Sequence, residues 1–458
     1  MHGCAPDSSR DGRGNALAGL EPAEALAFAS APEIEACANR LLQRHVQYCY
    51  ERSDFYRSHF DRLGLDAGDI RCVADLRKLP FTTKDDLAEH GARLRCVAPR
   101  DIVDLCQTSG TTGAPVTLEL TELDLQRLAY NEQSCFEAAG LTADDRVIVA
   151  CAMGRCFMAG LAYFEGLRRL GATAIRIGAG RPAVLAEAVR IHRPTAVVGV
   201  PSNLLQTGKL LQSRGIEPSQ MGVARLILIG EPIREADLSL SALGRRLSEL
   251  WKAQVLGTYA STEMATSFAE CDGGSGGGHV LADLIVVEIV DEAGNAVAPG
   301  EPGEVVATPL QVTGMPLLRL RTGDIAALLP GPCACGRRTP RLGPVLGRKA
   351  QMLKVQGTTL YPASIFAALQ EIEEVRNYYI EIEQDYELSD HPRVVVGLED
   401  GASMTREEIA GRICGRVRVT LDVAIATPEE VAKRTLLENR RKPMLVFDYR
   451  HKTKKGPA

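Results

Sequence analysis

The run RVIVA at residues 146–150 opens the part of the chain that decides the fold. Similar short runs of β-branched and aliphatic residues follow it, separated by helical patterns: ATAIRI at 172–177, TAVVGV at 195–200, ARLILI at 224–229 and QVLG at 254–257. Strands that alternate with helices in this way form a mostly parallel sheet with helices on both faces. The sequence therefore predicts an α/β fold built on mostly parallel sheets.

The regions on either side of this stretch have different patterns. Between residues 23 and 63 apolar residues recur at helical spacing, which predicts helices. Between Asp283 and Leu329 turn clusters separate the strand-like runs LIVVEIV, GEVVAT, PLLRL and DIAALL, which predicts a smaller antiparallel sheet. Beyond a segment rich in Gly, Pro and Arg, two strand-like runs (VRNYYIEIE and RVVVGL) and a helical stretch at 405–417 indicate an α+β region. We therefore divide the chain into a flexible tail at 1–22, a large domain at 23–347 and a small domain at 348–458.

Composition narrows the functional class. At 458 residues the chain is too long for one ordinary core, so two or more domains are expected. The net charge of -5, with 53 Lys plus Arg against 58 Asp plus Glu, provides no broad basic field and disfavours nucleic-acid binding. No apolar run is long enough to span a membrane. Thirteen scattered cysteines argue against a disulfide framework and favour the cytoplasm.

The sharpest local feature is TSGTTGAP at residues 108–115. Its glycines and hydroxyls bring backbone N–H groups and side-chain donors around a small concavity, which suits the oxygens of a triphosphate. A polar surface turn is the alternative, and the Walker pattern GxxxxGK[ST] does not fit. The candidate phosphate-binding residues are Thr108, Ser109, Gly110, Thr111, Thr112 and Gly113.

TSGTTG resembles the phosphate-loop signature of the adenylate-forming superfamily, which contains acyl-CoA synthetases, luciferases and peptide-synthetase adenylation domains. Further resemblances follow in the order of that superfamily. Residues 259–263 (YASTE) resemble its aromatic-Gly-x-Thr-Glu element, and RTGD at 321–324 resembles its TGD element. Gly347 and Arg348, with Gln351, Lys354 and Gly357, resemble its GRxxDxxKxxG hinge. The resemblance spans roughly residues 80 to 450.

Adenylation joins a carboxylate to a phosphate, so a cation and aimed donors must offset the repulsion between two anions. The resemblance implies that Glu263 holds Mg²⁺ and that Thr262 contacts the α-phosphate. It also implies that Tyr259 stacks on adenine and that Asp324 accepts from the ribose hydroxyls. The remaining nucleotide-binding candidates by resemblance are Gly230, Glu231, Pro232, Ala260, Ser261 and Arg348.

Within the superfamily the chain is most similar to the phenylacetate-coenzyme A ligase branch. Three stretches carry this resemblance: MGRCFMAGL at 153–161, GEPGEVVATPL followed by PLLRLRTGDIA, and LGRKAQMLKVQGTTLYPASI. The branch activates aryl and arylacetic acids, and apolar residues with an aromatic component suit a flat ring. The candidate pocket residues are Arg155, Phe157, Met158, Ala159 and Tyr163. Core packing is the alternative for the apolar ones. Arg155 either pairs with a second anionic group on the acid or faces solvent.

A possible metal site can be argued from the residues themselves. Cys271 and His279 lie eight positions apart across a Gly-rich loop, and Cys333 and Cys335 form a CxC turn. Three thiolates and one imidazole can close a tetrahedral Zn²⁺ shell, which is structural because it leaves no position for a water nucleophile. Unpaired cysteines are the alternative. Members of the resembled branch can carry a similar cluster.

The end of the chain, ENRRKPMLVFDYR, resembles the terminal pattern GKxxRVxDxR of the branch. The resemblance places Lys442 at the position of a lysine that reaches the forming adenylate, with Arg441 and Lys433 as competitors. It also implies that the small domain is mobile and rotates about the hinge to admit a thiol. A long flexible side chain suits a cation that must approach and withdraw.

Several positions depart from the superfamily pattern. Ala114 stands where the phosphate loop usually has lysine, Gln351 where the hinge has aspartate, and Ala260 where glycine follows the aromatic residue; Pro443 follows Lys442. We expect an acid-thiol ligase that uses ATP, Mg²⁺ and coenzyme A and contains structural Zn²⁺. Transfer to a carrier-protein thiol or an amine, and a weakened nucleotide-binding module, are the alternatives. The sequence leaves homodimer formation open.

Overall fold

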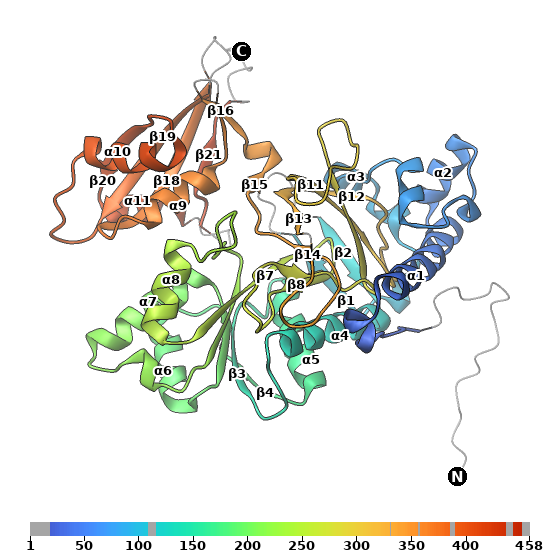
Figure 1. The fold of residues 1–458 in the computed structure, drawn as a ribbon, viewed down its shortest axis with the longest axis horizontal. Helices are drawn as coiled ribbons and strands as arrows, with labels where there is room; N and C mark the ends of the chain where they lie inside the picture. Colours follow the sequence, from blue (N-terminus) through green and yellow to red (C-terminus); the bar gives the residue numbers. More distant parts are fainter. Residues whose placement is uncertain are drawn as a thin grey trace.

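The computed structural model describes residues 19–108, 116–329, 331–355, 358–384, 390–436 and 443–450. Its main sheet has the strand order β4-β3-β5-β6-β7-β8 (Figure 1). The strands are β3 (Arg146–Ala150), β4 (Thr173–Arg176), β5 (Ala196–Gly199), β6 (Arg225–Ile229), β7 (Gln254–Ser261) and β8 (Thr266–Ala269). All neighbours are parallel except β7 and β8, so the predicted mostly parallel sheet is confirmed. β7 is longer than QVLG because its last four residues pair with β8.

Helices cover both faces of this sheet, and its residues alternate between two cores as expected for strands. Val197 of β5 packs in one core with α6 (Pro182–His192), α7 (Pro201–Ser213) and α8 (Ala242–Trp251). Val198 packs in the other with α4 (Glu122–Ala138) and α5 (Met158–Leu170). A short helix, η5 (Pro218–Gln220), lies between α7 and β6.

The N-terminal region contains the predicted helices, but they form separate elements. These are η1 (Glu24–Phe28), α1 (Ala31–Arg52), α2 (Asp54–Leu63), η2 (Ala67–Asp69), η3 (Val73–Lys78), α3 (Lys84–Leu94) and η4 (Pro99–Asp101). Ser53 separates α1 from α2 because its hydroxyl accepts from the Tyr56 N–H and caps α2.

Glu21 was predicted to lie in the tail, yet its N–H donates to Gln311 across 2.8 Å and it forms an ion pair with Arg40. Residues 19–22 therefore pack against the rest of the chain.

An antiparallel sheet follows the parallel one, as predicted. It consists of β10 (Ile285–Val290), β11 (Gly303–Pro309), β12 (Leu320–Ala326) and β15 (Gly347–Arg348). A smaller sheet joins β9 (Gly278–His279), β13 (Leu328–Leu329) and β14 (Arg341–Leu342). The prediction that PLLRL forms a strand is wrong, since only Leu320 belongs to β12. Arg319 has a φ of 50° and pairs with Glu288 at 2.9 Å, which turns the chain before β12.

The C-terminal elements form a separate lobe in Figure 1. They are η6 (Lys349–Gln351), β16 (Leu353–Val355), β17 (Thr358–Leu360), α9 (Pro362–Gln370), β18 (Val375–Gln384), β19 (Asp390–Leu398), α10 (Arg406–Val417), β20 (Asp422–Ala426), α11 (Pro428–Thr435) and β21 (Val446–Asp448). A sheet of order β20-β19-β18-β21 organises them. Their core contains only residues between Leu353 and Val446. Among the described residues, no helix combines the length and apolarity needed to cross a membrane.

Candidate active site

The carboxyl ends of β3, β5, β6 and β7 lie at one edge of the parallel sheet, which is where ligands bind in open α/β sheets. Gly230 follows β6 with a φ of 79°, and the pairing of Ile229 with Thr258 brings it beside Tyr259. Ser202, after β5, donates its N–H and hydroxyl to the Glu231 carboxylate at 2.9 and 2.8 Å. These contacts hold Glu231 against α7. Gly230 and Pro232 on either side of it are exposed.

Tyr259, Asp324 and Arg348 come together although they lie in three separate sequence motifs. The Tyr259 hydroxyl donates to Asp324 Oδ2 across 2.8 Å, and Arg348 Nε lies 3.3 Å from Asp324 Oδ1. Asp324 and Arg348 face each other in register on β12 and β15. The Tyr259 ring stacks on Phe268, with 5.8 Å between ring centroids. Burial and the Asp324 charge raise the pKa of Tyr259 well above its ordinary value, so its hydroxyl stays a hydrogen-bond donor.

Glu263 lies in the turn between β7 and β8, and only 7% of it is exposed. Lys84 Nζ lies 3.2 Å from Glu263 Oε1. Thr262 is half-buried, and its carbonyl accepts from the Ala265 N–H at 3.2 Å, which closes the turn. Sequence reasoning missed Lys84. Its only local signal is the capping box at Thr83, which marks the start of α3 and not the approach to Glu263.

The phosphate-loop residues Ser109 to Gly113, and Ala114, lie outside the described residues. The two ends of the loop are described: Thr108 and Val116 exchange two hydrogen bonds of 3.0 Å, N–H to carbonyl and N–H to hydroxyl. They extend the pairing of β1 (Asp104–Gln107) with β2 (Thr117–Leu120). The Gln107 N–H donates to the Cys156 carbonyl at 2.8 Å. The base of the loop therefore lies against the segment that leads into α5.

That segment contains the predicted acid-pocket residues, and the structure separates them by environment. Arg155 is exposed, with a φ of 58°. Phe157 and Ala159 are half-buried at the start of α5. Met158 packs with Cys106 and Ala265 in a small buried cluster, and Tyr163 is buried in the core with its ring 6.0 Å from that of Phe136. Packing accounts for the position of Tyr163.

Cys271, His279, Cys333 and Cys335 form a compact cluster in which the ligand atoms all lie within 4.8 Å of one another. The Cys271 and Cys333 sulfurs are 3.4 Å apart, as are Cys335 Sγ and His279 Nε2. Tetrahedral Zn–S bonds of about 2.3 Å place ligand atoms about 3.8 Å apart, so these separations fit a zinc shell. Thr339 Oγ1 lies 3.4 Å from His279 Nδ1, which leaves Nε2 facing the thiols.

The surroundings of the cluster shift its ionisation. Burial and the charges of Arg337 and Arg341 lower the pKa of His279 to about 4, so its imidazole is neutral at pH 7. Although burial opposes ionisation, hydrogen bonds from the Cys335 N–H and the Ser275 hydroxyl lower the pKa of Cys333 to about 7. His279 and Cys333 are thus shifted toward the neutral imidazole and the thiolate that bind zinc, whereas burial and the neighbouring thiols raise the pKa of Cys271 to about 12.

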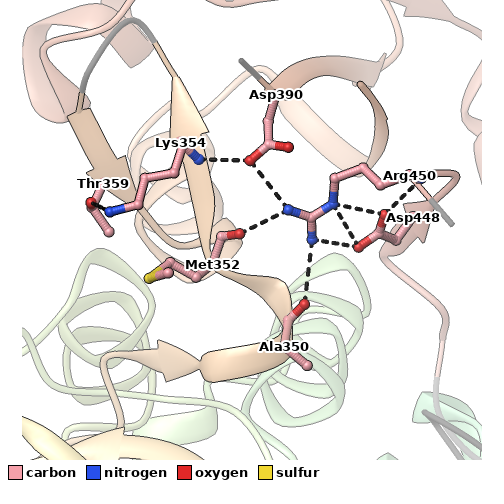
Figure 2. A network of polar contacts seen from close by, with 7 residues as sticks. All are labelled: Ala350, Met352, Lys354, Thr359, Asp390, Asp448 and Arg450. Atoms are coloured by element: carbon pink, nitrogen blue, oxygen red, sulfur yellow. Dashed lines mark hydrogen bonds and ion pairs between the residues drawn. The ribbon is translucent and has the colours of Figure 1, made fainter. Parts of the chain in front are cut away.

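The predicted hinge is tied to the end of the chain by the polar network in Figure 2. Arg450 Nη1 donates to the Met352 carbonyl at 2.9 Å and to Asp390 Oδ2 at 3.2 Å. The same Asp390 oxygen accepts from the Lys354 N–H at 2.7 Å. Gln351 is half-buried in η6, and the Lys354 side chain is exposed and donates to Thr359. Gly357 and Lys442 lie outside the described residues.

Two solved structures of one ligase have the same fold as this chain. A 2-hydroxyisobutyryl-CoA ligase in the postadenylation state superposes with a TM-score of 0.82 at 23% identity, covering 94% of each chain. The same ligase with coenzyme A in the thioesterification state gives a TM-score of 0.68 at 26% identity, covering 95% of each chain. The fold of this chain is therefore that of adenylate-forming enzymes.

Sequence comparison agrees with the fold. Residues 49–314 match the AMP-binding enzyme family. A phenylacetate-coenzyme A ligase from Escherichia coli is 30% identical over 405 residues, which cover 87% of this chain and 90% of the relative. One from Thermus thermophilus is 29% identical over 429 residues, covering 88% and 94%. The chain therefore belongs to the AMP-binding enzyme family, within the branch of the phenylacetate-coenzyme A ligases.

Proposed function

We propose that this chain is an acid-thiol ligase that activates an aryl or arylalkanoic acid with ATP and transfers the acyl group to coenzyme A. The observation that carries this function is the contact of Asp324 with both Tyr259 and Arg348. This contact brings together, at the carboxyl edge of the parallel sheet, the side chains that we propose bind adenine and ribose. Glu263 lies in the turn that continues from the strand of Tyr259. The names of the related ligases support the aryl class of acid.

The first half-reaction forms a bond between a carboxylate oxygen and the α-phosphorus of ATP, and the bond from that phosphorus to pyrophosphate breaks. Thr262 donates to the α-phosphate, and Glu263 binds Mg²⁺, which supplies positive charge to the phosphate oxygens. Gly230, Glu231 and Pro232 line the adenine pocket with Tyr259, and Asp324 accepts from the ribose. In the second half-reaction the thiol sulfur attacks the acyl carbon, and AMP leaves.

Lys84 replaces the cation that is missing from the phosphate loop. Alanine stands at position 114, where the superfamily has lysine. The Lys84 ammonium lies 3.2 Å from the Glu263 carboxylate, so a mobile positive charge is already beside the proposed Mg²⁺ ligand. Its side chain is 42% exposed, which leaves it room to turn toward the pyrophosphate. A lysine is suited to this role because its charge is on a long flexible stem.

The small domain at residues 348–458 serves both half-reactions. It has its own core, which supports movement as one body about the hinge at Arg348 to Lys354. Lys442 reaches the forming adenylate, and rotation then opens the path for the thiol. Gln351, at the hinge position where the superfamily has aspartate, is half-buried in a short helix that ends at that residue.

The Cys271, His279, Cys333 and Cys335 cluster holds one structural Zn²⁺. Four ligand atoms within 4.8 Å of one another fill a tetrahedral shell and leave no open position. The cluster joins the Gly-rich loop after Cys271 to the CxC turn, which lies 62 residues later in the chain. Its role is to hold this loop, which follows β8, against the end of α4, where the Asp272 N–H donates to the Ala138 carbonyl at 2.9 Å.

We place the enzyme in the cytoplasm, since none of the twelve cysteines of the described residues forms a disulfide. Coenzyme A is the favoured acceptor because the related ligases are named for it. A carrier-protein thiol and an amine are the competing acceptors, and a homodimer is the assembly to test alongside the monomer.

Pyrophosphate release with ATP and Mg²⁺ tests the function across a panel of benzoates, phenylacetates and aliphatic acids. Release that depends on one aryl acid, with a thioester formed when coenzyme A is added, is the expected result. Release without a thioester points to a carrier protein or an amine as acceptor. No release with any acid, in folded protein, overturns the ligase and favours a nucleotide-binding module.

A further inference from the structure

Arg127 of α4 is a buried cation whose partners are backbone carbonyls and a hydroxyl. Its side chain is fully buried. Nε donates to the Leu310 carbonyl at 2.6 Å, and Nη2 donates to the Leu284 carbonyl at 2.6 Å and to Thr266 Oγ1 at 2.8 Å. Nη1 donates to the Ala265 carbonyl. Burial lowers the pKa of Arg127 to about 10, so the guanidinium remains charged at neutral pH.

Two of these contacts are made to Ala265 and Thr266, which follow Glu263 and Met264 in the chain. Ala265 has a φ of 45°. This left-handed backbone conformation is strained for residues other than glycine. The Thr266 hydroxyl, which accepts from Arg127, donates in turn to the Met264 carbonyl at 2.9 Å. The guanidinium and this hydroxyl therefore hold the carbonyls of both residues after Glu263.

The position of Arg127 also relates this turn to the phosphate loop. β2 leads from the loop into α4, whose first turn is capped by Thr121. Leu128, the next residue on the helix, packs with Cys106 of β1 and with Ala265. One turn of α4 thus contacts the hairpin that carries the phosphate loop and the turn that carries Glu263.

We propose that Arg127 is a positioning residue that fixes the Glu263 turn for divalent-cation binding. The inference rests on the proposed function, in which Glu263 binds the cation. The planar guanidinium directs its donors in fixed directions, and here they reach three separate segments at Ala265, Leu284 and Leu310. A lysine keeps the charge but cannot hold these acceptors together, and an apolar side chain leaves the carbonyls without a donor.

The affinity for Mn²⁺ in the presence of a non-hydrolysable ATP analogue, measured by electron paramagnetic resonance, tests this without turnover. The variants are Arg127→Lys and Thr266→Val, with Glu263→Gln as the reference and Thr207→Val as the control. Thr207 is a buried threonine on α7 whose hydroxyl bonds to Asn203 of its own helix. We expect Arg127→Lys and Thr266→Val to weaken Mn²⁺ binding at least about fivefold, with Thr207→Val unchanged. In turnover, they raise the Mg²⁺ requirement and leave the KM for the acid within about twofold.

The outcomes separate the inference from the function on which it rests. If Glu263→Gln weakens Mn²⁺ binding and the Arg127 and Thr266 variants do not, the positioning role is overturned. If Glu263→Gln has no effect in protein that binds the nucleotide analogue, the assignment of the cation to Glu263 fails first. Should Arg127→Lys not fold, Thr266→Val decides the matter, because it removes only the hydroxyl that connects Arg127 to Met264.

Discussion

Arg450 donates a hydrogen bond to the main-chain carbonyl of Met352 across 2.9 Å, although 98 residues separate them (Figure 2). Met352 lies in the proposed hinge, and Arg450 follows β21 near the end of the chain. Asp390 joins the two, since it accepts from both Arg450 and the Lys354 N–H. The hinge and the terminal segment after Lys442 are therefore fixed to the same side of the small domain.

Replacing Arg450 should impair adenylation more than replacing a neighbouring arginine. In Arg450→Met the terminal segment loses its attachment to the hinge, and we expect pyrophosphate release to fall about fivefold, or about 1 kcal/mol in activation free energy. Arg434→Met is the control, because Arg434 stacks on Phe447 of the same terminal segment but contacts no hinge residue among the described ones. Equal losses in the two variants would show that the connection to the hinge has no special effect.

Lys442→Ala should reduce adenylate formation by more than about tenfold while the melting temperature is retained. A loss of about 1.4 kcal/mol of transition-state stabilisation already produces that factor. Single-turnover pyrophosphate release measures the first half-reaction, and thioester formation from supplied acyl-adenylate measures the second. The second rate should change little. An unchanged first rate would remove Lys442 from the mechanism and leave Arg441 and Lys433 as the residues to test.

Lys84→Ala should also slow pyrophosphate release by about tenfold. The substitution removes the one lysine that we propose approaches the pyrophosphate in place of a phosphate-loop lysine. Adding Ala114→Lys to this variant should restore part of the rate, since the charge returns to the position usual in the superfamily. Lys78→Ala is the matched control, as Lys78 pairs with Asp75 on η3. Rates equal to wild type in Lys84→Ala would contradict the compensation.

Metal analysis of the purified protein should find about one Zn²⁺ per chain, as closure by four ligands requires. Cys333→Ser should lose the metal and lower the melting temperature, because a structural metal contributes binding energy to folding. Cys414 is a half-buried thiol on α10, and the Cys414→Ser variant should keep the zinc content and the melting temperature of the wild type. A well-folded wild-type protein without zinc would leave the four residues as an ordinary cluster of polar contacts.

His45 should make the stability of the protein sensitive to acid. Burial lowers its pKa from 6.5 to about 3, so between these values the unfolded chain binds a proton that the folded chain does not. Stability is therefore complete above pH 6.5 and falls as the pH decreases toward 3, by at most about 1.4 kcal/mol per pH unit from this residue. In His45→Gln, melting temperatures measured from pH 7 to 4.5 should decline less steeply. His192 is half-buried on α6, and the melting temperature of the His192→Gln variant should decline with pH as that of the wild type does.

Sequence reasoning recovered the parallel sheet because its signal is local. Strands buried on both faces are short, continuously apolar runs: RVIVA became β3, and ARLILI contains the whole of β6. It failed at PLLRL, where an apolar composition resembles a strand but the left-handed φ of Arg319 and its pairing with Glu288 turn the backbone. It also missed the break at Ser53, because the helical periodicity on either side continues through the cap.

The sequence by itself determined the order of elements and the identity of the motif residues, since periodicity and residue chemistry are properties of neighbouring positions. Its resemblance to the superfamily proposed Tyr259, Glu263 and Asp324 as candidates, and the chemistry of four residues proposed the metal-ligand set. Only the tertiary structure brought Lys84 to Glu263 and Arg127 to the turn that follows it. No local pattern contains such contacts, because the packing of α3 and α4 against distant strands determines which side chains meet.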